Sequence, residues 1–267
     1  MKKQIAILLM ILLPAFAFMS CEEGGGINLF TLDQDIAFGK QLDSAILANP
    51  TEYPLLDETQ YATAYTHLKR VRDAILQSND LRYADRFEWK VKIIRNDEVI
   101  NAFAAPGGYM YFYTGLIKFL DNEAQFAGVM AHEMAHADRR HSTEVMTKQY
   151  GFSLLLSILL GDNPSMLETI IAQLAQGATE LKFSRSNEYE ADEYSIRYLY
   201  DTAYDPMGIA GFFQKMMGNT QKIPEFLSTH PSDANRLENI TLIWEDLGSK
   251  TGETYSDRYN QFKLSLP

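Results

Sequence analysis

His132, Glu133 and His136 form the pattern H-E-x-x-H, the part of this chain whose residue types and spacing are best suited to chemistry. An α-helix completes a turn in about 3.6 residues, so the two imidazoles would project from one face and could bind one zinc ion. Glu133 is then placed to remove a proton from an attacking water molecule. The pattern therefore predicts a metal-dependent hydrolytic site on one helix.

The sequence around this pattern predicts a helix that is held firmly in place. Asn122 and Gln125 have the spacing of a capping box, and apolar side chains recur at helical intervals over residues 126–130. The basic run at residues 139–141 suits a helix C-terminus, where positive charge is favourable. We interpret His141 as part of this helix end and not as a metal ligand. One face of the helix should be buried, which would position the histidines rigidly.

A third ligand must come from elsewhere, because a catalytic zinc ion usually takes three protein ligands and leaves one position open for water. Glu188 is the best candidate, since it lies in a second acidic helical stretch. Asp192 follows four residues later on the same helix face and could accept a hydrogen bond from the second ring nitrogen of a ligand histidine. We interpret Glu190 and Glu193 as solvent-facing.

Four sequence blocks occur in order along the chain. They are residues 101–108 (NAFAAPGG) with 113–116 (YTGL), 121–124 (DNEA) leading into 132–136 (HEMAH), 183–185 (FSR) with 188–192 (EYEAD), and 228–231 (STHP) with Arg236. By these blocks, the chain resembles the HtpX-type zinc metallopeptidases, a gluzincin family that also contains the CAAX prenyl proteases and the BepA-like periplasmic proteases. The resemblance implies that His132, His136 and Glu188 bind zinc and that Glu133 is the catalytic base. It also implies an α+β fold, in which a mainly helical zincin-like domain has a small β-sheet beside the active-site helix.

Two apolar or aromatic runs, residues 89–94 and 109–113, are predicted to be strands. The turn signal at residues 106–108 lies between them, so we expect a hairpin. The resemblance implies that an edge strand beside the metal binds the substrate backbone by β-augmentation, with little sequence preference. We accordingly expect Asn101, Ala102 and Phe103 to contact the substrate. The alternative is that the hairpin is only structural.

His230 and Arg236 are the remaining candidates for the active-site cleft, because their block resembles the loop of the family near the active site. Two roles stay open for His230. It could stabilise the oxyanion in the transition state, or it could occupy the open metal position in a resting state and act as a gate. Arg236 could pair with Asp192 and hold the cleft together, or it could lie on the surface. We interpret His67, on a basic amphipathic helix, as solvated and without a role.

The rest of the chain is predicted to be mainly helical, without internal repeats or a helical-repeat domain. Residues 152–160 form a very apolar helix that is too short to span a bilayer, which needs about 20 apolar residues. We favour a buried position for this helix; the alternative is a membrane-facing patch that covers the cleft. The other expected helices cover residues 33–48, 58–77, 166–181, 206–217 and 234–247.

The N-terminal residues have the properties of a targeting segment. Lys2 and Lys3 precede an apolar run over residues 5–18, and Ser20 precedes Cys21, which is the only cysteine in the chain. This arrangement is typical of a bacterial lipoprotein signal, in which cleavage leaves a lipidated cysteine; a plain secretory signal is the alternative. We expect a signal peptide over residues 1–20, a lipidated cysteine and flexible tether over 21–32, a zinc metallopeptidase domain over 33–248 and a loosely ordered tail over 249–267.

The composition limits the possible partners. Without Lys2 and Lys3 the chain has 22 basic residues against 35 acidic ones, a net charge of −13. Such an acidic surface argues against binding to nucleic acid or to anionic membranes through charge. One cysteine cannot form an intrachain disulfide, so stability must come from burial of one sizeable core.

These patterns together favour a zinc-dependent endopeptidase with one zinc ion per chain, anchored by lipid in the bacterial cell envelope, on the periplasmic side or at the outer membrane. The resemblance implies that its substrates are unfolded or misassembled envelope proteins. Two other functions stay open: an envelope chaperone or assembly factor with a latched or idle zinc site, and a catalytically inactive structural lipoprotein.

Overall fold

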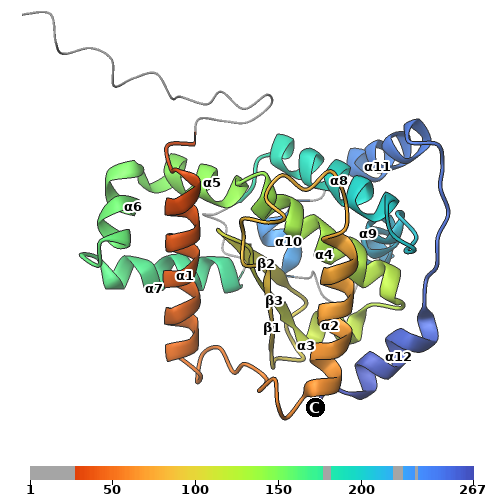
Figure 1. Ribbon diagram of the computed structural model, residues 1–267, viewed down its shortest axis with the longest axis horizontal. Coiled ribbons are helices and arrows are strands. Elements are labelled where there is room, and N and C mark those ends of the chain that lie inside the picture. The colour runs from red at the N-terminus through yellow and green to blue at the C-terminus, as the bar shows by residue number, and fades with distance from the viewer. Residues whose placement is uncertain (1–27, 177–181, 219–224, 232–233) are drawn as a thin grey trace, which may run out of the picture.

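The computed structural model describes residues 28–176, 182–218, 225–231 and 234–267, so the predicted signal peptide and Cys21 lie outside the described residues. A three-stranded sheet lies between α1 (Leu32–Ala48) on one side and α2 (Ala62–Ile75) and α4 (Glu123–Asp138) on the other (Figure 1). This is the mainly helical α+β architecture expected from the sequence. The other helices are α3 (Thr114–Phe119), α5 (His141–Tyr150), α6 (Phe152–Leu159), α7 (Pro164–Gln176), α8 (Arg185–Tyr200), α9 (Gly208–Gly218), α10 (Phe226–Thr229), α11 (Ala234–Asp246) and α12 (Ser256–Leu264).

The sheet has the strand order β1-β3-β2, with β1 at Lys90–Ile94, β2 at Ala102–Ala105 and β3 at Tyr109–Tyr113. β3 pairs parallel with β1 and antiparallel with β2. Both expected strands are therefore confirmed, but the hairpin expected between them is wrong. Gly107 and Gly108, with φ angles of 75° and 85°, instead form the turn that joins β2 to β3. β2 is consequently an edge strand of the sheet.

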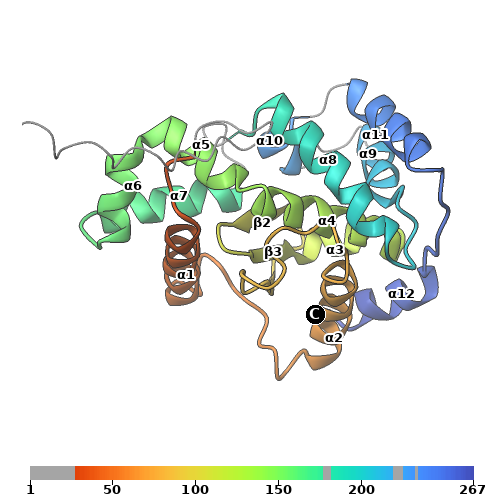
Figure 2. The same cartoon turned by 45° about the horizontal axis from the view of Figure 1, so that its top comes forward.

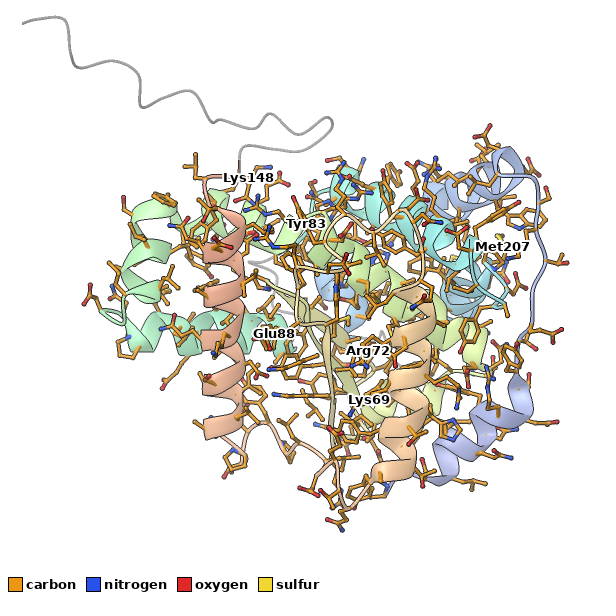
Figure 3. All side chains as sticks on the ribbon, in the orientation of Figure 1. Lys69, Arg72, Tyr83, Glu88, Lys148 and Met207 are labelled. Atoms are coloured by element: carbon orange, nitrogen blue, oxygen red, sulfur yellow. The ribbon has the colours of Figure 1, made fainter. Side chains whose placement is uncertain are left out.

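The two faces of the sheet contribute to two different hydrophobic cores, because successive strand residues point to opposite sides. Met110 and Phe112 belong to the core that includes α2, α4, α8, α9 and α12. Tyr109, Tyr111 and Tyr113 belong to the core that includes α1, α5, α6 and α7. Every residue of β2 and β3 is buried, and Figure 3 shows side chains filling the space between the layers.

Helix α4 is the centre of the molecule, and all its residues are buried rather than only one face. Asn122 caps it, accepting a 2.9 Å hydrogen bond from the backbone N–H of Gln125. The Gln125 side chain accepts instead from the N–H of Asp121, so only half of the predicted capping box forms. A Cβ atom at Gly128 would lie 2.3 Å from the backbone nitrogen of Ile209, so this glycine allows α9 to cross α4 closely.

Two segments differ from the expectation. Leu155 and Ile158 of α6 are buried, and Phe152, Leu154 and Leu159 are partly buried against the core. Leu160 directly after the helix is 70% exposed, so the favoured buried position holds for one side of this helix only. The residues after 248, expected to be loosely ordered, include α12, whose Tyr259 and Phe262 are fully buried in the core around α4.

Among the described helices, none taken singly combines the length and apolarity needed to cross a membrane.

His67 is also placed differently from the expectation. Its ring is 7% exposed and stacks on Phe262 of α12, with centroids 5.4 Å apart and planes 8° from parallel. Its Nδ1 atom lies 2.8 Å from a guanidinium nitrogen of Arg70, so Nδ1 accepts a hydrogen bond in the neutral ring. Burial and then the positive charge of Arg70 lower the pKa of His67. His67 is therefore a structural residue of the α2–α12 contact.

Candidate metal centre

His132, His136, Glu188 and His230 meet in one buried cluster, and their nitrogen and oxygen ligand atoms all lie within 4.8 Å of one another. The Nε2 atoms of His132 and His136 are 3.1 Å apart, because the two residues are one turn apart on α4. Glu188, on α8, places Oε2 3.6 Å from Nε2 of His132 and Oε1 3.7 Å from Nε2 of His136. The structure thus brings the three predicted ligands together from two separate helices.

The geometry and chemistry of this cluster fit one zinc ion. Zn–N bonds of about 2.0–2.1 Å in a tetrahedral site place neighbouring ligand atoms about 3.3–3.4 Å apart. The separations between the three predicted ligands, 3.1 to 3.7 Å, lie around this value. His230 approaches the fourth corner, with Nδ1 3.3 Å from Nε2 of His132 and 3.0 Å from Oε1 of Glu188. A cation at the centre would satisfy nitrogen lone pairs and carboxylate oxygens that otherwise face one another.

Asp192 and Arg236 support two of these side chains, as the sequence predicted. Asp192 Oδ1 lies 3.0 Å from Nδ1 of His132, so the proton of this imidazole is on Nδ1 and the Nε2 lone pair faces the cluster. Arg236 donates two hydrogen bonds of 2.7 Å to the same carboxylate, and its Nη1 lies 2.7 Å from Oε2 of Glu188. Arg236 is 2% exposed and is therefore a buried clamp between two carboxylates rather than a surface residue.

A second support, for His136, was missed by the sequence reasoning. Nδ1 of His141 lies 3.0 Å from Nδ1 of His136, and Nε2 of His141 lies 3.2 Å from Oε2 of Glu190. If His136 presents its Nε2 lone pair to a metal, its Nδ1–H donates to His141, which in turn donates to Glu190. His141 is 1% exposed and begins α5, so it is not part of the end of α4 as expected. Arg140, with φ at 61°, breaks the helix and turns His141 back towards His136.

Glu133 lies beside the cluster and against the edge of the sheet. Its carboxylate accepts a hydrogen bond from the backbone N–H of Ala104 in β2, and its Oε1 lies 3.4 Å from Nε2 of His230. Burial raises the pKa of Glu133, although the charges of His230 and His132 act in the opposite direction. A carboxylate with a raised pKa is a stronger base than one in water, and it is well suited to accept and later return a proton.

The electrostatics of the cluster favour positive charge. Burial lowers the pKa of His132, but the carboxylates of Asp192 and Glu188 outweigh it and raise the pKa to about 9. Burial raises the pKa of Glu188, but His230 and Arg236 outweigh it and hold the pKa well below its ordinary value. Burial and the neighbouring cationic side chains lower the pKa of His136. The two carboxylates therefore favour a positive charge at this position, which a divalent cation would supply.

The site is closed to solvent. Phe183 stacks on His136 with centroids 3.9 Å apart, and Phe226 of α10 stacks on His230 at 4.2 Å. The N-terminus of α10 is fixed to the chain just before β2, because the N–H of Phe226 donates to the carbonyl of Ile100 over 3.1 Å. His132, His136, Glu188 and His230 are each at most 1% exposed.

The predicted substrate-binding residues lie on or next to the edge strand β2 and are buried. Because the carbonyl of Asn101 pairs with β3, the backbone groups of Ala102 and Ala104 point away from the sheet, towards the metal side. Phe103 instead stacks on Tyr111 of β3, with centroids 4.7 Å apart. The side chain of Asn101 donates to a carbonyl of α7, so α7 covers the start of this edge.

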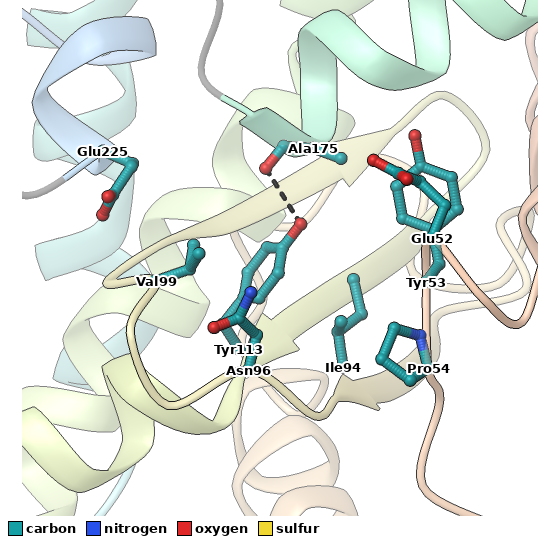
Figure 4. Close-up of a pocket in the computed structure, with 9 residues that line it drawn as sticks. All are labelled: Glu52, Tyr53, Pro54, Ile94, Asn96, Val99, Tyr113, Ala175 and Glu225. Atoms are coloured by element: carbon teal, nitrogen blue, oxygen red, sulfur yellow. Dashed lines mark hydrogen bonds between the residues drawn. The ribbon is translucent and has the colours of Figure 1, made fainter.

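A surface pocket of about 220 Å³ lies where the covering elements meet the sheet (Figure 4). Ala175 at the end of α7 accepts a hydrogen bond of 2.9 Å from the Tyr113 hydroxyl, and Glu225 lies at the start of α10. The pocket does not contain the metal cluster. It borders the end of α7 and the start of α10, and its lining is Glu52, Tyr53, Pro54, Ile94, Asn96, Val99, Tyr113, Ala175 and Glu225.

The chain is similar in sequence to a protein family and to several known proteins. The sequence profile of peptidase family M48 matches residues 63–243. The chain is 31% identical over 223 residues to a beta-barrel assembly-enhancing protease of Yersinia pestis, covering 78% of this chain and 43% of the relative. It is 30% identical over 183 residues to the mitochondrial metalloendopeptidase OMA1 of Arabidopsis thaliana, covering 64% of this chain and 36% of the relative. It is 35% identical over 159 residues to the beta-barrel assembly-enhancing protease of Escherichia coli K12, covering 54% and 32%. The chain thus spans less than half the length of these relatives.

Proposed function

Since the chain belongs to peptidase family M48, whose members are zinc metalloproteases, we propose that it is a zinc-dependent endopeptidase with His132, His136 and Glu188 as the zinc ligands. The observation that carries the proposal is the convergence of these side chains from α4 and α8 into one buried cluster. The finer likeness to HtpX-type, CAAX-type or BepA-like members is part of the proposal.

Glu133 would act as the general base. Zinc held by His132, His136 and Glu188 would polarise the scissile carbonyl and make the attacking water more acidic. The Glu133 carboxylate accepts the proton of that water and later gives it to the leaving amine. The hydrogen bond from Ala104 orients this carboxylate, and the buried environment raises its pKa. Asp192 and His141 orient the two imidazoles through their Nδ1 atoms.

We propose that the substrate is an extended segment of an unfolded or misassembled envelope protein, bound along β2. The outward-facing backbone groups of Ala102 support this mode, since β-augmentation depends on main-chain hydrogen bonds and little on side-chain identity. Those of Ala104 are already paired, the N–H with Glu133 and the carbonyl with the Ser142 hydroxyl. The side chains of Asn101 and Phe103 would position the strand rather than contact the substrate, because they are held by α7 and by Tyr111. The names of the relatives from Yersinia pestis and Escherichia coli support an envelope substrate.

We propose that the protein is a lipoprotein of the bacterial envelope, with residues 1–20 removed and the lipid carried by Cys21. This rests on the basic start, the apolar run and the single cysteine of the sequence. The peptidase domain would begin near residue 33, and the packing of α12 supports extending it beyond residue 248.

The closed arrangement is proposed to be a resting state, in which His230 occupies the fourth metal position. Two contacts support a latch: Nδ1 of His230 is 3.0 Å from Glu188 and 3.3 Å from His132. A substrate would have to displace α10 to reach Glu133 and the outward edge of β2. The alternative role, in which His230 stabilises the oxyanion, requires the same ring to face the substrate.

The closed site also favours a second candidate function, that of an envelope chaperone or assembly factor with an idle zinc site. Glu133→Gln separates the two, because it removes the base while leaving the ligand set intact. The peptidase proposal expects this variant to lose cleavage of an unfolded test protein and to fail in the cell. A variant that loses cleavage yet restores envelope integrity to a strain lacking the gene would show that peptide hydrolysis is not the cellular role.

A further inference from the structure

The α6–α7 hairpin projects from one end of the molecule (Figures 1 and 2). α6 contains no charged residue. Leu156 and Leu160 are spaced by four residues, so they share one side, whereas Phe152 packs against the core. Leu160 is 70% exposed and Leu156 is partly exposed. Together α6 and α7 have the length and apolar composition of a membrane segment, but they are bent by 107°.

The turn of this hairpin leaves few polar groups unsatisfied. The backbone N–H groups of Leu160, Gly161 and Asp162 donate to carbonyls of the preceding helix over 2.9 to 3.0 Å. The Asn163 amide donates to the Ser157 hydroxyl over 2.6 Å. Internal pairing of backbone groups is what an apolar environment requires. The charged side chain of Asp162 limits the depth of any insertion to the headgroup region.

The N-terminal end of the described chain lies directly beside α6. The ring of Phe30 meets that of Phe152 edge-on at 5.5 Å, and Asn28 donates to the Thr143 hydroxyl over 3.1 Å. Six residues lie between Asn28 and Cys21 in the sequence. A chain spans at most about 3.6 Å per residue, so a lipid on Cys21 would hold the membrane surface within about 25 Å of this point.

We propose that the exposed face of the α6–α7 hairpin docks on the lipid surface that anchors the N-terminus, with Leu156 and Leu160 entering the acyl boundary. The docking rests on the lipid anchoring proposed above. It does not need anionic lipid, because α6 carries no charge and the chain is acidic overall. α7 continues from this hairpin to Ala175, whose carbonyl accepts hydrogen bonds from Asn101 and Tyr113. One helix therefore connects the proposed lipid contact to the residues beside β2.

A single fluorophore tests this contact. The lipidated chain, with Cys21 blocked by its lipid, is reconstituted in phosphatidylcholine vesicles that contain nitroxide-labelled lipid, with one dye on Leu160→Cys. Leu264→Cys, at an 85% exposed position on α12, is the matched control. Docking predicts quenching at position 160 at least threefold stronger than at position 264. Adding Leu156→Glu should abolish the difference, and adding Leu242→Glu, at a 56% exposed position on α11, should preserve it.

The other outcomes separate the proposals. If the chains float with the vesicles in a density gradient but quenching is equal at positions 160 and 264, the docking proposal is wrong, while the lipid-anchor and peptidase proposals are unaffected. If the chains do not float with the vesicles, both the lipid-anchor proposal and the docking proposal are wrong. Cleavage of an unfolded protein, measured in the same samples, reports on the peptidase independently. An emission shift at position 160 that appears without vesicles and grows with protein concentration would assign the face to a second copy and overturn the proposal.

Discussion

Asp192 Oδ1 lies 3.0 Å from Nδ1 of His132, deep in the contact between α8 and α4. The same carboxylate is held by two hydrogen bonds of 2.7 Å from Arg236. This arrangement fixes the proton of His132 on Nδ1 and turns Nε2 towards Glu188 and His136. One helix therefore supplies both a carboxylate of the cluster, Glu188, and the group that orients His132.

Asp192→Asn should lower zinc affinity about 10- to 100-fold, because a neutral amide raises the basicity of His132 less than a carboxylate does and cannot accept both hydrogen bonds from Arg236. Competition with a chromophoric chelator measures this. Glu193→Gln, which affects a carboxylate paired with Arg197 on the same helix, is the control and should leave the affinity unchanged. Equal affinity of the two variants would contradict the role of Asp192.

His141 should support His136 in the same way but more weakly, since its partner Glu190 is 24% exposed in its side chain. His141→Phe should lower zinc affinity about tenfold and speed metal release. His141→Asn can retain the contact with His136 but loses the contact with Glu190. Its zinc affinity and its rate of zinc release should therefore lie between those of His141→Phe and the wild type. Zinc release measured by a fluorescent chelator ranks the three proteins. A release rate that is the same in all three would remove His141 from the metal centre.

His230→Ala should raise the rate at which an unfolded protein is cleaved, by several-fold. The latched arrangement lowers the fraction of molecules that can bind substrate, and removal of the ring restores it. The rate of cleavage at saturating zinc, with zinc content measured in parallel, tests this. A fall in rate of about 10²–10³-fold with zinc retained would instead assign His230 to oxyanion stabilisation.

His67 should make the protein less stable in mild acid. Its folded-state pKa is lowered below its unfolded value of 6.5, so the unfolded chain binds the proton more readily. The stability that the neutral ring contributes is therefore complete above pH 6.5 and is lost as pH falls below it. His67→Gln should reduce the drop in melting temperature between pH 7 and pH 5. An identical drop in wild type and variant, measured calorimetrically in one buffer series, would contradict this assignment.

The sequence was informative where a local pattern determined the geometry. The i, i+4 spacings predicted that His132 and His136 share one helix face and that Glu188 and Asp192 share another, because both depend only on helical periodicity. That the two faces meet was implied by the family resemblance and not by the spacing. The roles of His67 and His141 could not be predicted in this way. His67 is buried by Phe262, almost two hundred residues later, and His141 returns to His136 only because Arg140 adopts a left-handed conformation. The parallel pairing of β1 with β3 likewise depends on a crossover that a turn signal does not reveal.

The central claim is that one zinc ion held by His132, His136 and Glu188 is required for hydrolysis. The most direct test is digestion of an unfolded protein by the purified chain, after removal of metal with a chelator and again after zinc is restored. The account predicts that cleavage stops with the chelator and returns with one equivalent of zinc per chain. Cleavage that continues in metal-free protein would contradict it.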